Sequence, residues 1–370
     1  MAPIRRIGQG PALTIEAAPA YEFFMSVMAV TDEEQVDTLD IGPEWIAEAR
    51  RRAGPKLLAR SNAVAHGVPG SWIHFVGLAF DSPAPHDVAS VLEHLRETDA
   101  DEIRLHLVDF YDRETRRLTP PEVIRKAVAG DADATRAFLR SCHPDIESWQ
   151  TYLKAVLDED PEAYKSELIA VLDEWAASVF AAEEPAILPI LERDVEAKRE
   201  LAGTMPLTDF IKTATNGVEF SPRPGVERIA LVATYVNRPL VTYQEVGETL
   251  VIVYPVADES VAAETDAPPL RLVRLAKALA DEKRLRILRA LADGEKGLME
   301  LAEQFGVPKT TMHHHMIVLR SAGLVAVAVG SKRYRLREET VPDLDELLSA
   351  YLGGSSAPTA APRTAATGSQ

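Results

Sequence analysis

Cationic and hydrogen-bonding side chains gather in one stretch of the chain, residues 270–337. This stretch holds 14 Lys and Arg against 6 Asp and Glu, a balance of +8, whereas the whole chain carries −17. The remaining residues are therefore at −25. A compact basic island in an acidic protein is typical of a surface that binds a polyanion. The chemistry it predicts is recognition of phosphates and base edges by Lys, Arg, His and Thr side chains.

The apolar spacing within this island predicts the elements that position those side chains. Asp281 is suited to cap a helix, Gly306 to end the next one, and Pro308 to begin a third. The expected elements are helices at 272–279, 281–291, 298–305 and 309–321, and strands at 325–329 and 332–337. This order is that of a winged helix-turn-helix, which places one helix in the DNA major groove.

The helix at 309–321 is the expected recognition helix, and its helical wheel separates two faces. One set of residues is apolar and should pack inward: Met312, Met316 and Leu319. The other set should face the groove: Thr310, His314, Ile317 and Ser321, with His313 on the flank. After Gly330-Ser331, basic residues alternate with Tyr334 and Leu336, so that one face of the hairpin is charged.

The predicted DNA contacts follow from this arrangement. Side chains that should reach base edges are His314, His313, Thr310 and Thr311. Side chains that should hold phosphates are Lys309, Arg320, Lys332, Arg333 and Arg335. Base contacts would set the sequence and phosphate contacts the position. The alternative reading is an ordinary small helical domain with a solvated charged surface.

Residues 276–337 resemble the DNA-binding domain of ArsR-type bacterial transcriptional regulators. The resemblance rests on three runs, 278–288, 300–302 and 315–325. It implies a winged-helix fold, binding to double-stranded DNA, and a homodimer formed through the first and last helices of the module. Those helices would be about 270–280 and 344–352, although the last could instead pack on the N-terminal domain. The whole chain also resembles regulators in which a long helical domain of unclear role precedes such a module.

No metal site or other cofactor is expected. The resemblance implies a Cys-x-Cys in the third helix of metal-sensing members, but Leu298-Met299-Glu300 stands there, and Cys142 is the one cysteine of the chain. One thiolate cannot build a soft-metal site alone. Three consecutive histidines, residues 313–315, point about 100° apart on a helix and cannot converge on one ion.

The N-terminal two-thirds predicts a mainly α fold with minor β structure. Apolar periodicity indicates helices near 87–95, 161–180 and 188–201. Residues 226–236 and 249–254 are β-branched and predict a small antiparallel sheet, which a strand at 12–16 could join. The expected domains are a helical domain at 1–256, an acidic linker at 257–269, the winged helix at 270–352 and a disordered tail at 353–370.

Other features narrow the function. No run of about 18 apolar residues is present, so no membrane span is predicted. A single cysteine fits a reducing cytoplasm. No HExxH, Gly-rich phosphate loop or Gly-x-Ser-x-Gly occurs, and six histidines outside the module lack ligand spacing, so no catalytic residue is expected. The sequence thus predicts a cytoplasmic, dimeric transcriptional regulator, and the resemblance implies that it is a repressor. Its N-terminal domain would either respond to an unidentified effector or brace the dimer. Two alternatives stay open: an N-terminal enzyme or a protein-interaction domain, either of them tethered to DNA.

Overall fold

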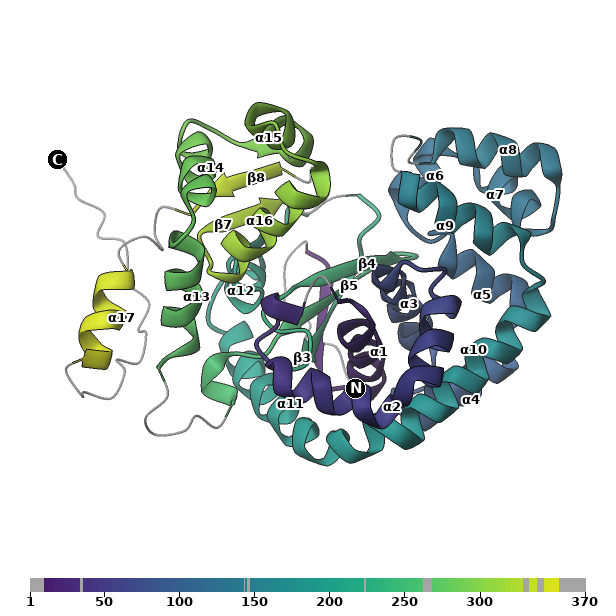
Figure 1. Cartoon of the computed structure of the whole chain (residues 1–370), viewed down its shortest axis with the longest axis horizontal. Helices are drawn as coiled ribbons and strands as arrows, with labels where there is room; N and C mark the ends of the chain where they lie inside the picture. Colours follow the sequence, from purple (N-terminus) through teal and green to yellow (C-terminus); the bar gives the residue numbers. More distant parts are fainter. Residues whose placement is uncertain are drawn as a thin grey trace. The chain divides into compact units, whose positions relative to one another are not determined.

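The chain divides into two compact parts, Met1–Val261 and Ala262–Gln370, here called the N-terminal unit and the C-terminal unit (Figure 1). The computed structural model describes residues 10–33, 36–142, 144, 147–222, 224–261, 268–328, 333–337 and 343–352. The predicted disordered tail, 353–370, lies outside the described residues. As predicted, the fold is mainly helical with small sheets.

Helices make up most of the N-terminal unit. In chain order they are α1 (Pro19–Thr31), α2 (Pro43–Val64), α3 (Phe75–Asp81), α4 (Val88–Glu97), α5 (Ala100–Leu107), α6 (Arg113–Leu118), α7 (Pro121–Val128), α8 (Ala132–Ser141), α9 (Glu147–Asp158), α10 (Pro161–Trp175), α11 (Ala181–Ala202) and α12 (Leu207–Ala214). Short helical turns lie at η1 (Val36–Thr38), η2 (Pro69–His74), η3 (Ala176–Phe180) and η4 (Asp258–Ser260). The predicted helices near 87–95, 161–180 and 188–201 correspond to α4, α10 with η3, and α11.

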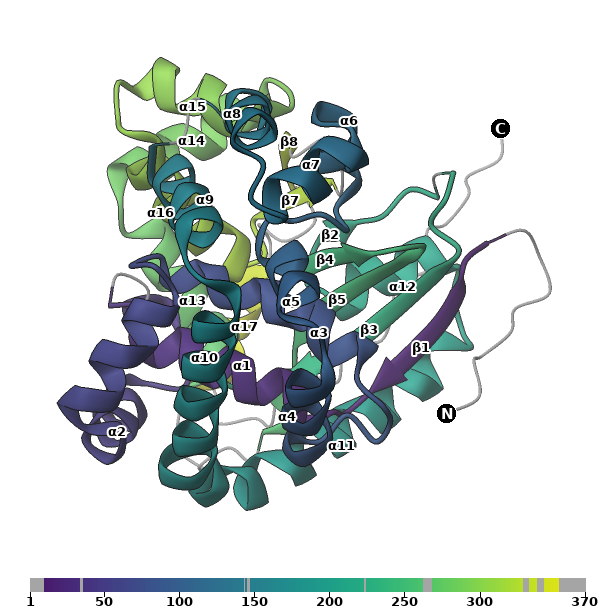
Figure 2. The same ribbon diagram turned by 90° about the vertical axis from the view of Figure 1, so that its right-hand side faces the viewer.

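A four-stranded mixed sheet completes this unit, with strand order β1-β3-β5-β4. The strands are β1 (Ala12–Glu16), β3 (Arg228–Thr234), β4 (Thr242–Val246) and β5 (Thr249–Pro255). A two-residue strand outside this sheet, β2 (Val218–Glu219), lies between β1 and β3 in the chain. Figure 2 shows β1 at the edge of the sheet, where it runs parallel to β3.

The predicted antiparallel sheet is therefore wrong in part. β3 and β5 pair in parallel, Arg228 opposite Thr249, and only β4 and β5 form an antiparallel hairpin. β4 was not predicted because its polar sequence, Thr-Tyr-Gln-Glu-Val, carries little of the apolar signal of a strand. It follows β3 in the chain but lies on the far side of β5, so β3 can pair with β5 in the same direction.

The core of the N-terminal unit is built around α1, in which all 13 residues are buried. This helix contacts α2, α3 and α4 as well as β3. On the sheet, Ala230 and Val232 join the same cluster as α1. The alternate residues Ile229 and Leu231 are also fully buried, and α11 contacts β1 and β3. Helices thus cover both faces of the sheet, which explains its unbroken apolar runs.

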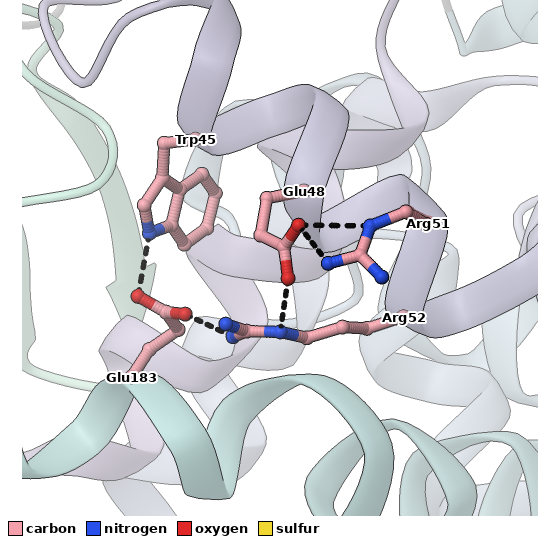
Figure 3. Close-up of polar contacts among 5 residues, drawn as sticks. All are labelled: Trp45, Glu48, Arg51, Arg52 and Glu183. Atoms are coloured by element: carbon pink, nitrogen blue, oxygen red, sulfur yellow. Dashed lines mark hydrogen bonds and ion pairs between the residues drawn. The ribbon is translucent and has the colours of Figure 1, made fainter.

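A polar cluster joins α2 to α11 across the chain (Figure 3). The Trp45 indole donates to Glu183 at 2.7 Å, and the Arg52 guanidinium pairs with the same carboxylate. Glu48 in turn accepts from Arg52 at 2.8 Å and from Arg51 at 2.9 Å. This cluster lies before a break in α2 at Gly54, whose φ of 68° favours glycine. It therefore holds the first half of a kinked helix.

The C-terminal unit consists of five helices and a small sheet among its described residues. The helices are α13 (Leu270–Leu279), α14 (Glu282–Ala292), α15 (Leu298–Phe305), α16 (Lys309–Ser321) and α17 (Asp343–Leu352). The strands are β6 (Lys296–Gly297), β7 (Val325–Ala328) and β8 (Arg333–Leu336). β8 pairs antiparallel with both β7 and β6. The predicted element order is thus found along this unit.

Residues 257–260 differ from the predicted linker. Val256 is 2% exposed, and Ser260 is 5% exposed and bonded to α11. These residues form η4 within the N-terminal unit. Their acidic composition made them look solvated, but Ala257 and Ser260 bond to Asp194 on α11 and Asp258 pairs with the buried Arg238.

Candidate nucleic-acid interface

The entry to α16 is set by the turn after α15. Gly306 ends α15 in the left-handed region at φ 60°, which a side chain would strain. Pro308 then stands at the N-cap of α16. At the other end of α15, the Gly297 N–H donates to the Glu300 carboxylate at 2.9 Å. Both ends of α15 are therefore fixed. Because α16 follows directly after the turn, its direction relative to α15 is fixed as well.

The first half of α16 is the exposed part of the predicted recognition helix. Exposed side chains there are Lys309, Thr310, Thr311, His313 and His314. The predicted inward residues are buried: Met312 and Met316 at 1% and Leu319 at 0% exposure. The first turns of α16 thus present cationic and hydrogen-bonding groups over an apolar base.

Ile317 is a correction to the helical wheel, because it is 7% exposed rather than turned to a groove. α13, α15 and β7 all contact α16, so the second half of the helix is packed on more than one side. Ser321 is partly buried, and its hydroxyl donates to the Val318 carbonyl at 2.8 Å. The exposed face is therefore shorter than predicted and ends near His314.

The surroundings lower the pKa of two histidines of α16. Desolvation, and then repulsion from Arg320 and Lys309, lowers the pKa of His313. His315 is 8% exposed, and desolvation is also the main cause of its lowered pKa, partly opposed by Asp281. His315 therefore belongs to the packed side of α16, whereas a neutral His313 can both donate and accept toward a base edge.

Some cations of the basic island serve the fold. The Arg284 guanidinium donates to the Ala278 and Lys277 carbonyls at 2.9 and 2.7 Å, at the end of α13. Asp281 caps α14 through the Arg284 amide at 2.9 Å, as predicted. Net charge alone therefore overstates the number of cations available to DNA.

The predicted phosphate-binding residues of the hairpin and of late α16 differ in their exposure and partners. Arg333 pairs with Glu300 at 3.0 Å and donates to the Glu295 carbonyl at 2.7 Å. Arg335 and Arg320 are partly buried. Lys332 lies outside the described residues. Sequence reasoning missed the Arg333–Glu300 pair, because 33 residues separate the partners in the chain.

The N-terminal unit contains a histidine cluster that the spacing of histidines in the sequence did not show. The rings of His66 and His74 both lie 5.8 Å from that of Tyr152. His74 is within 2.9 Å of the Asp109 carboxylate. Nearby, burial and then repulsion from His74 lower the pKa of His106 to about 3. Within the described ranges, no three His, Cys, Asp or Glu side chains are placed to hold a metal ion.

Across the part of the chain that the structure describes, no helix is both long and apolar enough to span a membrane. All five predicted DNA-contacting side chains on the first turns of α16 lie at the surface. The remaining four lie elsewhere: Arg320 later on α16, Arg333 and Arg335 on β8, and Lys332 outside the described residues.

Known proteins resemble the C-terminal unit of the chain. Residues 279–328 match a family described as a helix-turn-helix domain. The chain is 39% identical over 75 residues to the HTH-type transcriptional regulator KmtR of Mycobacterium tuberculosis, which covers 20% of this chain and 58% of the relative. It is 39% identical over 64 residues to the HTH-type transcriptional regulator CmtR of Mycobacterium bovis, which covers 17% and 54%. No solved structure matches.

The chain thus spans little more than half the length of these relatives, and they span about a fifth of the chain. The likeness confirms the predicted resemblance of the C-terminal module to ArsR-type regulators. This module of the chain is a helix-turn-helix domain of the kind found in transcriptional regulators.

Proposed function

We propose that the protein is a cytoplasmic transcriptional regulator of the ArsR class that binds double-stranded DNA through a winged helix-turn-helix. The observation that carries this proposal is the exposed first half of α16, set by Gly306 and Pro308 within the matched helix-turn-helix domain. In the proposal, Thr310, His313 and His314 reach base edges, and Lys309 holds a phosphate. The β7–β8 hairpin is the wing.

The proposed active form is a homodimer. α17 contacts α13 and leaves Leu348, Tyr351 and Leu352 exposed at 43%, 42% and 74%. Burial of these side chains against a second copy would remove apolar surface from water. A symmetric dimer would bind two half-sites about one helical turn apart.

The proposal assigns no reaction and no metal to the chain. In this proposal, the C-terminal module represses transcription by occupying DNA. The N-terminal unit changes the affinity of the module for that DNA. An unidentified effector would act through the N-terminal unit.

Binding can be measured by fluorescence anisotropy of the full chain on DNA from upstream of its own gene. Two salt concentrations and a non-specific competitor separate phosphate attraction from sequence recognition. Lys309→Ala should weaken binding to all sequences and flatten the salt slope by about one. Lys283→Ala is the matched control, because it removes an exposed lysine from α14. Equal effects of the two variants, or no competitor-resistant binding, would contradict the proposal.

A further inference from the structure

The chain leaves the N-terminal unit through a short segment that is anchored at four of its five residues. This exit segment, residues 256–260, follows β5. The Val256 N–H donates to the Thr234 carbonyl at 2.9 Å, at the end of β3. The Ala257 N–H and the Ser260 hydroxyl both donate to one oxygen of Asp194, at 2.7 and 2.9 Å. The segment is therefore held by both the sheet and α11.

Asp194 is a buried charge that depends on the exit segment. Its side chain is fully buried, and the Lys198 ammonium lies 3.3 Å from it. Two of its hydrogen-bond donors, Ala257 and Ser260, belong to the segment. Burial and the Asp194 carboxylate together raise the pKa of the Tyr254 phenol, which keeps the neighbouring group neutral. If the segment lifted away, the carboxylate would lose these donors in a site shielded from water.

A second buried charge, of opposite sign, also contacts the segment. Arg238 is 2% exposed, and its guanidinium pairs with Asp258 in η4. The Asp258 side chain is 30% exposed, so it can separate from Arg238 into solvent, whereas Arg238 stays buried. Loss of the pair would leave a buried guanidinium without its counter-charge. Because Asp194 and Arg238 hold neighbouring residues, the segment should dock or release as one piece.

The turn that carries Arg238 is fastened to the central helix. The Glu22 carboxylate of α1 accepts from the Thr234 hydroxyl at 2.6 Å and from the Tyr235 and Val236 amides at 3.0 and 2.6 Å. Arg238 follows two residues later. A change at α1 or α11 can therefore reach the exit segment through direct contacts.

We infer that the exit segment is a latch through which the N-terminal unit sets the DNA affinity of the C-terminal unit. The inference rests on the proposed function and names its means of regulation. With the latch closed, residues 261–269 connect Ser260 to α13. Release adds the exit segment to that connection and gives the DNA-binding module more freedom. The closed latch is the high-affinity state, because the shorter connection leaves the DNA-binding module less conformational freedom to lose when it binds DNA.

The test compares Asp258→Asn with Glu259→Gln in the full chain. Each removes one negative charge from adjacent positions, but Asp258 contacts Arg238, whereas Glu259 is exposed. Hydrogen exchange of the amides of 256–260 reports the latch, and anisotropy on operator DNA reports affinity. Asp258→Asn should speed exchange about tenfold and raise the Kd for DNA roughly three- to tenfold. Glu259→Gln should change neither.

Ser260→Ala provides a milder opening if Asp258→Asn fails to fold, because it removes only the hydroxyl bond to Asp194. It should shift exchange and affinity in the same direction by a smaller factor. Unchanged exchange in both variants would refute the latch, and faster exchange with unchanged or tighter DNA binding would refute its coupling to affinity. Absence of specific DNA binding by the unaltered chain would instead refute the proposed function, and the inference with it.

Discussion

Two helices of 13 residues each, α1 and α16, use the same length of chain in opposite ways. Every residue of α1 is buried, and its polar side chains bond within the unit: Glu22 to the turn after β3, Ser26 to Phe23. In α16, five of the first six side chains are exposed. The polar groups of α1 hold the fold together, whereas those of α16 are presented outward. Whether a polar side chain of a helix stabilises the fold or is available to a ligand therefore depends on the elements packed around that helix.

Glu22→Ala should break this comparison most severely. It leaves the buried Val236 amide and the partly buried Tyr235 amide without their acceptor, so the N-terminal unit should lose about 3–5 kcal/mol of unfolding free energy. All four tryptophans precede residue 176, so tryptophan fluorescence in denaturant follows this unit alone. Glu192→Ala, at an exposed position of α11, should change little. Comparable losses in both variants would mean that Glu22 is an ordinary helix residue.

Glu22→Gln sharpens the comparison through pH. Burial raises the pKa of Glu22 from 4.5 to about 7, against its three hydrogen bonds. A raised pKa means that the folded state holds the proton of Glu22 more tightly than the unfolded state does. The protonated Glu22 therefore contributes its full share of folding stability below pH 4.5, and this share is lost as pH rises through 7. The unaltered chain should lose about 2 kcal/mol between about pH 5.5 and 8 from this group, and the variant should not. Parallel pH profiles of the two proteins would refute the assignment.

On α16, the corresponding change should leave stability alone. His314→Ala removes an exposed side chain, and we expect it to reduce discrimination between operator and a mismatched site by about 1 kcal/mol. Competition anisotropy with single-base variants of the operator measures this difference. If specificity survives while overall affinity falls, His314 contacts phosphate rather than a base. Loss of thermal stability would show that α16 resembles α1 more than its exposure indicates.

His315 should give the smallest effect, since it is the buried histidine within the exposed helix. Its pKa is lowered on folding, so its contribution to stability is present above the unfolded value of about 6.5 and is lost as pH falls through the lower folded value. An NMR titration of the full chain should show His315 protonating below the ordinary histidine value of about 6.5. Protonation of His315 at or above that value would contradict its burial.

Local signals in the sequence predicted the C-terminal unit well. Asp281, Gly306 and Pro308 mark helix ends because capping depends on residues next to one another, and Met312, Met316 and Leu319 follow from periodicity. The prediction that Ile317 faces the groove was wrong, because a helical wheel does not show how many neighbouring elements surround a helix.

The N-terminal unit was predicted only in outline. The strands at 226–236 and 249–254 were found, but not their parallel pairing, since that depends on where β4 lies. Glu22 gave no sequence signal for its role, because its partners lie more than 200 residues away. The exit segment looked like a linker for the same reason: Asp194 and Arg238 are distant in sequence.

The pairing of β1 with β3 has a consequence for synthesis. Ala12 lies opposite Arg228, so β1 is made 216 residues before its partner. At ribosomal rates of 5–20 residues per second, that delay is on the order of tens of seconds. During this time the apolar α1, which follows β1 directly, has no sheet to cover it. The nascent chain should therefore depend on chaperones until β5 has emerged, and truncation before residue 228 should yield aggregates.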